Sequence, residues 1–266
     1  MKKILYIAAI FSALFFQACD SVSDTDRYID IPQTPVEKNV LLVDFTGQRC
    51  PNCPNAAIVA KTLKEQYGEH LVVVSMHAGD KAVYPTATLK GLKTETGDNY
   101  NSYYNIKMHP TAVFDGKSSS ISSDIDQWAN TVKDYIQTSS PIDIHLSCDY
   151  NADTREITIT SNINSNEVMQ QNLKLQLWVL ENKIIAFQQL PDLTVNQSYE
   201  HNHIFRDAVN GQWGEDISLV LGDASTYTNK YTLNESWIPE NIDIVGFVFN
   251  AATKEVYQAT QVSIIK

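Results

Sequence analysis

The stretch VDFTGQRCPNC at residues 43–53 constrains the fold more than any other part of the sequence. It overlaps an apolar run, residues 39–45, of the kind found in strands that are buried on both faces. Residues 56–68 have helical spacing, and a second apolar run occupies residues 70–76. Strand, helix and strand in this order predict a βαβ unit with a parallel sheet. The two cysteines lie where the first strand leads into the helix.

The cysteine pair lies where thiol chemistry is favoured. A thiolate at a helix N-terminus meets free backbone N–H groups and the positive end of the helix dipole, so we expect a depressed pKa for Cys50. Cys53, one helical turn further on, is placed to resolve a mixed disulfide on Cys50. Asp44 lies within the apolar strand, where burial raises the pKa of a carboxyl group. It is placed to exchange a proton with Cys53.

A second motif, His109-Pro110-Thr111, precedes a short apolar strand. With this motif, the first stretch resembles the thioredoxin signature: an aspartate in a strand, a Cys-x-x-Cys pair at a helix start and a later cis-proline. The resemblance covers residues 36–138 and implies a thioredoxin-like fold. It also implies four catalytic roles: Cys50 as nucleophile, Cys53 as resolving thiol, Asp44 as buried base and Pro110 as the cis-proline.

Two residues beside the sulfurs are expected to contact a substrate. In thioredoxin-like proteins the cis-proline loop faces the sulfurs and offers backbone to an extended substrate, so the resemblance implies a contact from His109. Arg49 directly precedes the first cysteine, replaces the aromatic residue that is usual there and is the second predicted contact. Pro54 is a further departure from the pattern, because a proline there kinks the first turn or delays the regular helix.

Three uses of the cysteine pair remain open from the residues alone: redox exchange, a local structural disulfide, and half of a zinc site. Zinc would need two more ligands, and His77 and His109 are the nearest candidates. The cis-proline loop of the resembled fold keeps metals away from the sulfurs. We therefore predict a redox-active Cys50–Cys53 disulfide, with no metal and no cofactor.

The segments between the second apolar run and residue 138 complete the first predicted domain. Residues 81–106 are predicted to be mostly helical after Pro85. Residues 111–114 form a short strand that ends in an Asp-Gly turn, and residues 124–137 have the spacing of a closing amphipathic helix.

From Pro141 the apolar period changes from that of a helix to that of a strand. Residues 142–150 alternate apolar and polar, which predicts a half-buried strand with Cys148 facing inward. Further strand-like segments follow at 155–161, 172–181, 216–222, 230–234, 242–250 and 256–265. Short strands with polar turns favour an antiparallel sandwich. The predicted fold class is thus an α/β thioredoxin-like domain at 38–138, followed by an all-β immunoglobulin-like sandwich domain at 139–266.

The N-terminal residues indicate export. Residues 4–16 form an apolar run that is too short to span a bilayer and has the length of a signal-peptide core. The following Phe16-Gln17-Ala18-Cys19 resembles a bacterial lipobox, which predicts a signal peptide at 1–18 and a lipid on Cys19. Residues 19–37 are polar and acidic and are predicted to be a flexible tether to this membrane anchor. The net charge of -11 disfavours nucleic-acid binding.

Two further segments resemble a known family. GQRCPNCPNAA at 47–57 and YEHNHIFRDAVNGQWGE at 199–215 are similar to the outer-membrane-protein-28-related lipoproteins of Bacteroidetes. The resemblance implies an outer membrane lipoprotein, either periplasmic or exposed at the surface. His201 and His203 in the second segment share one strand face, but no third ligand can be placed. They are predicted to belong to a hydrogen-bonded loop.

Two functions are compatible with these observations. The first is a thiol–disulfide oxidoreductase that acts on thiols or disulfides of exported proteins through Cys50 and Cys53. The second is a cell-surface interaction protein that binds a glycan or protein ligand on its β-sandwich, with a structural disulfide. Of the two, the sequence favours the oxidoreductase.

Overall fold

The computed structural model describes residues 35–265. The predicted signal peptide, the first part of the predicted tether and the predicted lipidation site Cys19 lie outside the described residues. Within those residues, no helix combines the length and the apolar character that crossing a membrane requires.

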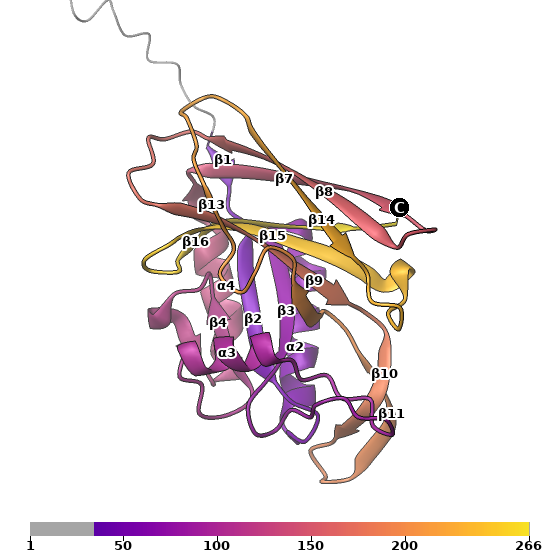
Figure 1. Cartoon of the computed structure of the whole chain (residues 1–266). Helices are drawn as coiled ribbons and strands as arrows, with labels where there is room; N and C mark the ends of the chain where they lie inside the picture. Colours follow the sequence, from indigo (N-terminus) through magenta and orange to yellow (C-terminus); the bar gives the residue numbers. More distant parts are fainter. Residues whose placement is uncertain (1–34, 266) are drawn as a thin grey trace, which may run out of the picture. The chain divides into compact units, whose positions relative to one another are not determined.

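A mixed nine-stranded sheet dominates the described part of the chain (Figure 1). Its strands follow in the order β16 (Val256–Ser263), β15 (Ile242–Asn250), β9 (Leu173–Glu181), β12 (Ile204–Ala208), β3 (Leu71–His77), β2 (Val40–Thr46), β4 (Thr111–Phe114) and β5 (Ile121–Ser122). A short strand, β13 (Glu215–Ile217), also pairs with β9. Strands β2 and β3 are parallel, as the βαβ pattern predicts, and β4 is antiparallel to β2.

The predicted fold class is wrong. The strands of the βαβ unit do not form a thioredoxin-like domain of their own, because β12 lies parallel to β3 and antiparallel to β9 and so joins them to the C-terminal strands. A single cluster of buried residues draws on both predicted domains and includes Leu41, Phe45, Met76, Trp178, Phe205 and Phe247. An open edge of β3 would expose backbone N–H and C=O groups, and pairing with β12 satisfies them. The change of period near residue 140 therefore marks no break in the sheet.

A sandwich-like arrangement does occur in the C-terminal part, although it shares the large sheet. Strands β14 (Ser225–Thr232), β8 (Glu156–Ser165) and β7 (Ile142–Asn151) form a three-stranded antiparallel sheet. Their alternating inward residues pack against β9 and β15 in a second apolar cluster that includes Ile144, Ile159, Leu177 and Ile244. Cys148 is half-buried beside this cluster and forms no disulfide.

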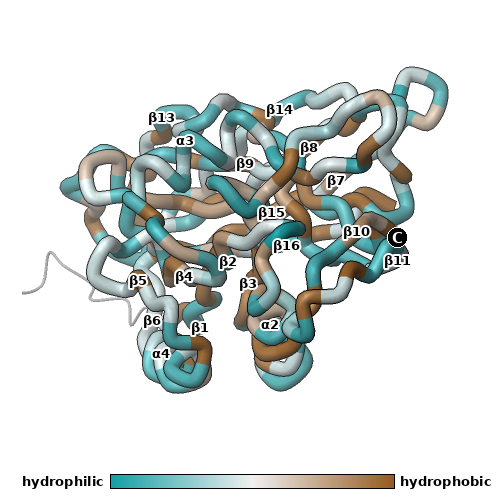
Figure 2. Tube along the Cα trace, turned by 90° about the horizontal axis from the view of Figure 1, so that it is seen from below, coloured by the Kyte–Doolittle hydropathy of each residue, from teal (hydrophilic) through white to brown (hydrophobic). Residues whose placement is uncertain are grey.

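Helices cover both faces of strands β2, β3 and β4 (Figure 2). Helix α2 (Cys53–Tyr67), which runs into the 3-10 turn η2 (Gly68–His70), and helix α4 (Trp128–Ile136), which follows η4 (Ile125–Gln127), pack on one face. Helix α3 (Glu95–Tyr103) packs on the other, where Tyr100 contacts Trp178. The closing helix predicted at 124–137 is thus confirmed in its place and approximate bounds.

The long helix predicted between 85 and 106 is mostly absent, since only α3 is helical there. The chain instead folds back on itself ahead of α3, and the Lys93 N–H donates to the carbonyl of Val83 at 3.0 Å. A Cβ on Gly91 would lie only 2.2 Å from the backbone carbon of Tyr84, so glycine permits this close approach.

One hairpin was not predicted at all. Strands β10 (Ile184–Gln189) and β11 (Val195–His201) pair antiparallel and form a separate two-stranded sheet. The remaining elements are short: β1 (Val36–Glu37) pairs with β6 (Ser139–Ser140), and η3 (Ser118–Ser120) and η5 (Pro239–Asn241) lie in loops.

Candidate functional site

The floor of the site is the C-terminal half of strands β2 and β3. Successive strand residues point to opposite faces, so residues two apart share a face. On the face turned towards α2, the apolar positions of both strands give way to polar ones as the strands end. The register pairs Asp44 with Ser75 and Thr46 with His77, which brings four polar side chains together.

The predicted cysteine pair lies at the edge of this floor. Cys50 ends a tight turn in which its N–H donates to the carbonyl of Gly47 at 3.0 Å, and Cys53 begins α2. The two sulfurs form a disulfide, as predicted, and each cysteine is only 2% exposed. Arg49 is exposed, and its N–H donates to the carbonyl of Lys81 at 2.9 Å. Its backbone thus fixes the turn, while its side chain is exposed.

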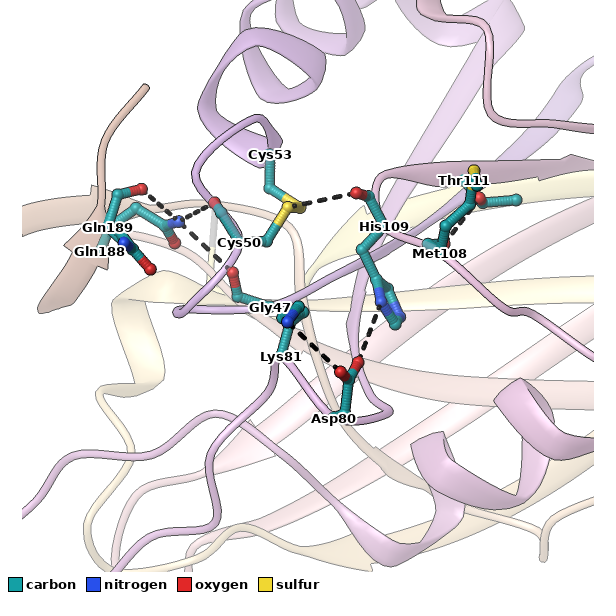
Figure 3. Close-up of a disulfide and its surroundings, with 10 residues drawn as sticks. All are labelled: Gly47, Cys50, Cys53, Asp80, Lys81, Met108, His109, Thr111, Gln188 and Gln189. Atoms are coloured by element: carbon teal, nitrogen blue, oxygen red, sulfur yellow. Dashed lines mark hydrogen bonds and ion pairs between the residues drawn. A yellow bond between two sulfur atoms is a disulfide. The ribbon is translucent and has the colours of Figure 1, made fainter. Parts of the chain in front are cut away.

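The unpredicted hairpin covers the turn that carries the disulfide (Figure 3). The buried side-chain amide of Gln188 donates to the carbonyls of Cys50 at 2.9 Å, Gly47 at 3.3 Å and Gln189 at 3.0 Å. The N–H of Gln189 donates to the carbonyl of Gln48 at 2.8 Å. The hairpin is therefore fastened to the disulfide loop by both backbone and side-chain hydrogen bonds.

A second glutamine, Gln48, completes this attachment. Its fully buried side chain donates to the carbonyls of Lys90 at 3.1 Å and Phe187 at 3.2 Å, and it accepts from the N–H of Leu92 at 3.0 Å. Sequence reasoning missed Gln48 and Gln188 because it considered only residues with redox or metal chemistry. The short apolar run at residues 184–187, followed by the turn signal Pro191-Asp192, is the sequence signal that could have revealed the strand carrying Gln188.

The loop of His109 and Pro110 approaches the disulfide from the opposite side. The peptide bond between them is cis, and the carbonyl oxygen of His109 lies 3.4 Å from the Cys50 sulfur. This is a contact only, because a disulfide sulfur has no proton to donate. The imidazole of His109 is turned towards Asp80, with 3.9 Å between Nδ1 and the carboxylate (Figure 3). Burial lowers the pKa of this imidazole.

A cavity of about 480 Å³ opens between the strand floor, helix α2 and the hairpin. Its wall includes, on the floor, Asp44, Thr46, Ser75 and His77; on α2, Cys53, Pro54, Ala57, Ile58, Ala60 and Lys61; and on and after the hairpin, Gln188, Tyr199, Glu200, His201, Asn202 and His203. The structure thus brings Asp44 and Cys53 to one space, as the sequence predicts. Arg49, His109 and Pro110 are not part of its wall.

The electrostatics of the cavity are dominated by groups that burial keeps neutral. Asp44 is 2% exposed, and desolvation raises its pKa to about 8. Its Oδ1 atom has no hydrogen-bond partner among the described residues. Burial lowers the pKa of His201 to about 4 and that of His77 well below its usual range. The rings of these two histidines meet edge to face, with centroids 5.3 Å apart.

The predicted histidine loop is only partly a loop. His201 ends strand β11, and the chain then turns at Asn202, whose side chain accepts from the Lys183 N–H at 2.9 Å. The backbone of His203 adopts a positive φ of 58° and its N–H donates to Asn182 at 2.8 Å. Across the described residues, no three histidine, cysteine, aspartate or glutamate side chains come together as metal ligands would.

The sequence matches the family model of outer membrane protein Omp28 over residues 97–266. This match spans more than half of the chain. The protein belongs to the Omp28 family. The predicted resemblance to this family and the predicted outer membrane location are confirmed. No match is found among curated proteins.

Solved structures of similar shape include HBP35 of Porphyromonas gingivalis, which is 19% identical with a TM-score of 0.69 and is matched over 88% of this chain and 77% of that one. A protein from Agrobacterium tumefaciens is 15% identical with a TM-score of 0.55, over 88% of this chain and 97% of its own. A domain of the outer membrane lipoprotein Omp28 from Porphyromonas gingivalis is 28% identical over 47% of this chain and 88% of that domain, with a TM-score of 0.36. The first two likenesses concern the fold alone.

The Omp28 match begins after the cysteine pair. It includes the hairpin and the histidines that follow it, whereas Asp44, Cys50 and Cys53 lie outside the matched residues. In this Omp28-family chain, the cavity therefore combines a wall from the matched region with a floor from the preceding one.

Proposed function

We propose that this outer membrane protein binds a ligand without catalysis and that its disulfide is structural. One observation carries the proposal: the loop at residues 47–50, which ends in the disulfide, serves as the attachment point of the β10–β11 hairpin, through Gln188. A disulfide that fixes this loop also fixes one wall of the cavity. The cavity of about 480 Å³ has the size of small-molecule and side-chain binding sites.

The burial of the sulfurs supports a structural role. Cysteines that exchange disulfides are partly exposed, because a second sulfur must reach them in line. Here each cysteine is 2% exposed, with the hairpin on one side and the His109 loop on the other. Cys53 lines the cavity, but Cys50 is not part of its wall, so a thiol that attacks Cys50 would have to displace one of these segments first.

The ligand site proposed here is the cavity, in place of the β-sandwich surface of the second sequence-based hypothesis. Polar side chains line the floor and the hairpin side of the cavity, and mostly apolar ones line the helix side, a mixture that is common in sites that orient a ligand. A glycan or protein ligand remains compatible with such a wall.

The reduction potential of the disulfide tests this proposal. We would replace the free Cys148 by alanine, so that no other described thiol takes part, and equilibrate the full-length protein with reduced and oxidised dithiothreitol. A structural disulfide is expected below about -300 mV. In a Cys53→Ser variant, Cys50 should capture no substrate as a mixed disulfide. A Cys50→Ala/Cys53→Ala double variant should fold and lose roughly 2 kcal/mol, as expected for so short a loop.

A second candidate function is thiol–disulfide exchange with exported proteins. The specific observation in its favour is that Asp44, whose pKa is raised to about 8 by burial, lines the same cavity as Cys53. Such a carboxyl group can take up and return the proton of a resolving thiol at neutral pH. A potential above about -230 mV, together with mixed disulfides trapped on Cys50, would establish this function and overturn the first.

A further inference from the structure

We propose that the cavity between α2 and the β10–β11 hairpin binds a protonated alkyl amine, with Asp44 as the carboxylate that receives it. The amine is either the lysine side chain of a protein or peptide, or a free alkyl amine. This inference rests on the proposed binding function and names the ligand class of the same site.

Asp44 is a buried acid without a counter-charge. It is 2% exposed, its Oδ1 atom lacks a partner among the described residues, and it lines the cavity wall. Burial alone accounts for the rise of its pKa, since no positive group acts on it. Lys61 at the cavity wall does not neutralise Asp44, because its side chain is 74% exposed and its ammonium lies 3.8 Å from the carboxylate of Glu65. An incoming cation would supply the missing charge.

Two imidazoles offer further acceptors for the same group. The Nδ1 atoms of His77 and His203 are buried and have no hydrogen-bond partner in the described part of the chain, and both residues line the same cavity. Burial lowers the pKa of both histidines, so each ring is neutral and carries one nitrogen that can accept. An ammonium group has three N–H donors and no acceptor, which complements one carboxylate and neutral imidazoles.

The geometry disfavours the other charged ligands. No three metal-ligating side chains converge among the described residues, so a cation that needs several fixed ligands lacks them. An anion would meet Asp44 on the floor and Glu200 on the wall. The net charge of -11 adds a long-range attraction for cations.

The helix side of the cavity fits an alkyl chain. Pro54, Ala57, Ile58 and Ala60 of α2 line this side, and Ile58 is 63% exposed. An exposed isoleucine favours contact with methylene groups, because the contact removes apolar surface of both from water. The combination of apolar wall and buried carboxyl group selects an alkyl ammonium over a bare ammonium ion.

Calorimetric titration of the full-length protein in detergent tests the proposal. The probes are n-butylamine, n-butanol as its neutral counterpart, and N-acetyl-lysine amide with N-acetyl-norleucine amide as the matched pair for a peptide-borne chain. We expect each amine to bind at least tenfold more tightly than its neutral partner. Asp44→Asn should remove this preference, whereas Asp126→Asn, which removes an exposed carboxylate outside the cavity wall, should change it less than threefold. Tighter binding of N-acetyl-lysine amide than of n-butylamine would identify the ligand as a protein side chain.

Proton release provides a readout that a merely structural Asp44 would not give. At pH 7 the free carboxyl group is mostly protonated, so amine binding should release close to one proton, measured from heats in buffers of different ionisation enthalpy. Amine affinity should rise roughly tenfold from pH 6 to pH 7 and level off above pH 8. The other titratable groups that face Asp44 are Lys61 on α2, His77 on β3, and Tyr199, Glu200, His201 and His203 on and after β11.

The outcomes separate this inference from the proposed function. Equal affinity for amine and alcohol, no binding of any probe, or an unchanged preference in Asp44→Asn would each overturn the amine site. In those cases, a disulfide potential below about -300 mV would still support the proposed binding function with a structural disulfide. Mixed disulfides trapped on Cys50 would overturn the proposed function whatever the amines do. Unfolding curves of Asp44→Asn verify that the variant is folded.

Discussion

Two buried aspartates near opposite ends of strand β2 differ in the partners that the protein gives their carboxyl groups. Asp115, which follows β4, is 1% exposed and lies 3.2 Å from the ammonium of Lys38, and it accepts from the N–H of Leu41 at 2.9 Å. Lys38 in turn donates to the carbonyls of Val256 and Tyr257. Asp44 is equally buried, yet its Oδ1 atom has no partner in the described residues.

The difference separates a structural carboxyl group from one that is left available. Burial raises the pKa of both aspartates, but for Asp115 the charge of Lys38 and the N–H of Leu41 oppose this rise. The first is a complete buried ion pair that fastens β16 to the start of β2. The second faces a cavity, which is the arrangement expected where a ligand completes the site.

The largest effect on stability is expected at the buried ion pair between Asp115 and Lys38. Asp115→Asn should lower the free energy of unfolding by about 3–5 kcal/mol, because it leaves the Lys38 ammonium buried without its partner. Urea unfolding at pH 7 measures this. Glu255→Gln is the control, since its partly exposed pair with Lys117 should be worth less than about 1 kcal/mol. If Asp115→Asn lowered the free energy of unfolding by less than about 1 kcal/mol, the contrast between a paired Asp115 and an unpaired Asp44 would be contradicted.

Asp44→Asn should instead raise the free energy of unfolding. The pKa of Asp44 is raised from 3.8 to about 8, so between these values the folded protein holds a proton that the unfolded chain has released. Its contribution to stability therefore falls as pH rises from about 4 to 8, then stays level. Relative to wild type, the variant should be unchanged at pH 4 and roughly 2–4 kcal/mol more stable at pH 8.5. If the variant and the wild type were equally stable at both pH values, the carboxyl group of Asp44 would have a partner in the folded protein.

The sequence predicts this aspartate well but not its surroundings. A carboxylate inside NVLLVDF is recognisable as a buried acid because the run on both sides is apolar. The Cys50–Cys53 disulfide and the position of Pro110 also follow from local motifs. What closes the cavity is the hairpin at 184–201, over a hundred residues away, and pairing over that distance leaves no mark on the local pattern near Asp44.

Gln188→Ala tests how firmly the hairpin closes the site. The substitution removes the donor that serves the carbonyls of Gly47, Cys50 and Gln189, and should cost about 1–3 kcal/mol. Amide hydrogen exchange in β10 and β11 should accelerate, while β9 stays protected. Gln189→Ala is the matched control, because Gln189 bonds the disulfide loop through its backbone. Unchanged exchange in the hairpin would show that Gln188 does not hold it.

The same long-range effect explains why the fold class was mispredicted. Residues 39–76 have all the local features of a βαβ unit, and they do form one. Whether such a unit ends a domain depends on the free edge of β3, and β12 pairs there through Ile204 and Ser75. Residues 204–208 are too few, and too mixed in polarity, to predict a strand that unites two halves of a sheet.

The smallest effect on stability is expected at Lys61 on the cavity wall. Its effect on amine binding tests whether Asp44, unlike Asp115, is available to a ligand. Lys61 is 74% exposed and its pair with Glu65 is 3.8 Å long, so Lys61→Gln should change stability by less than about 0.5 kcal/mol. Its positive charge opposes an incoming ammonium, so the variant should bind n-butylamine up to about threefold more tightly at low salt, with the gain lost at high salt. Weaker n-butylamine binding in Lys61→Gln would contradict this expectation, because it would show that Lys61 supports the amine site instead of repelling the ammonium group.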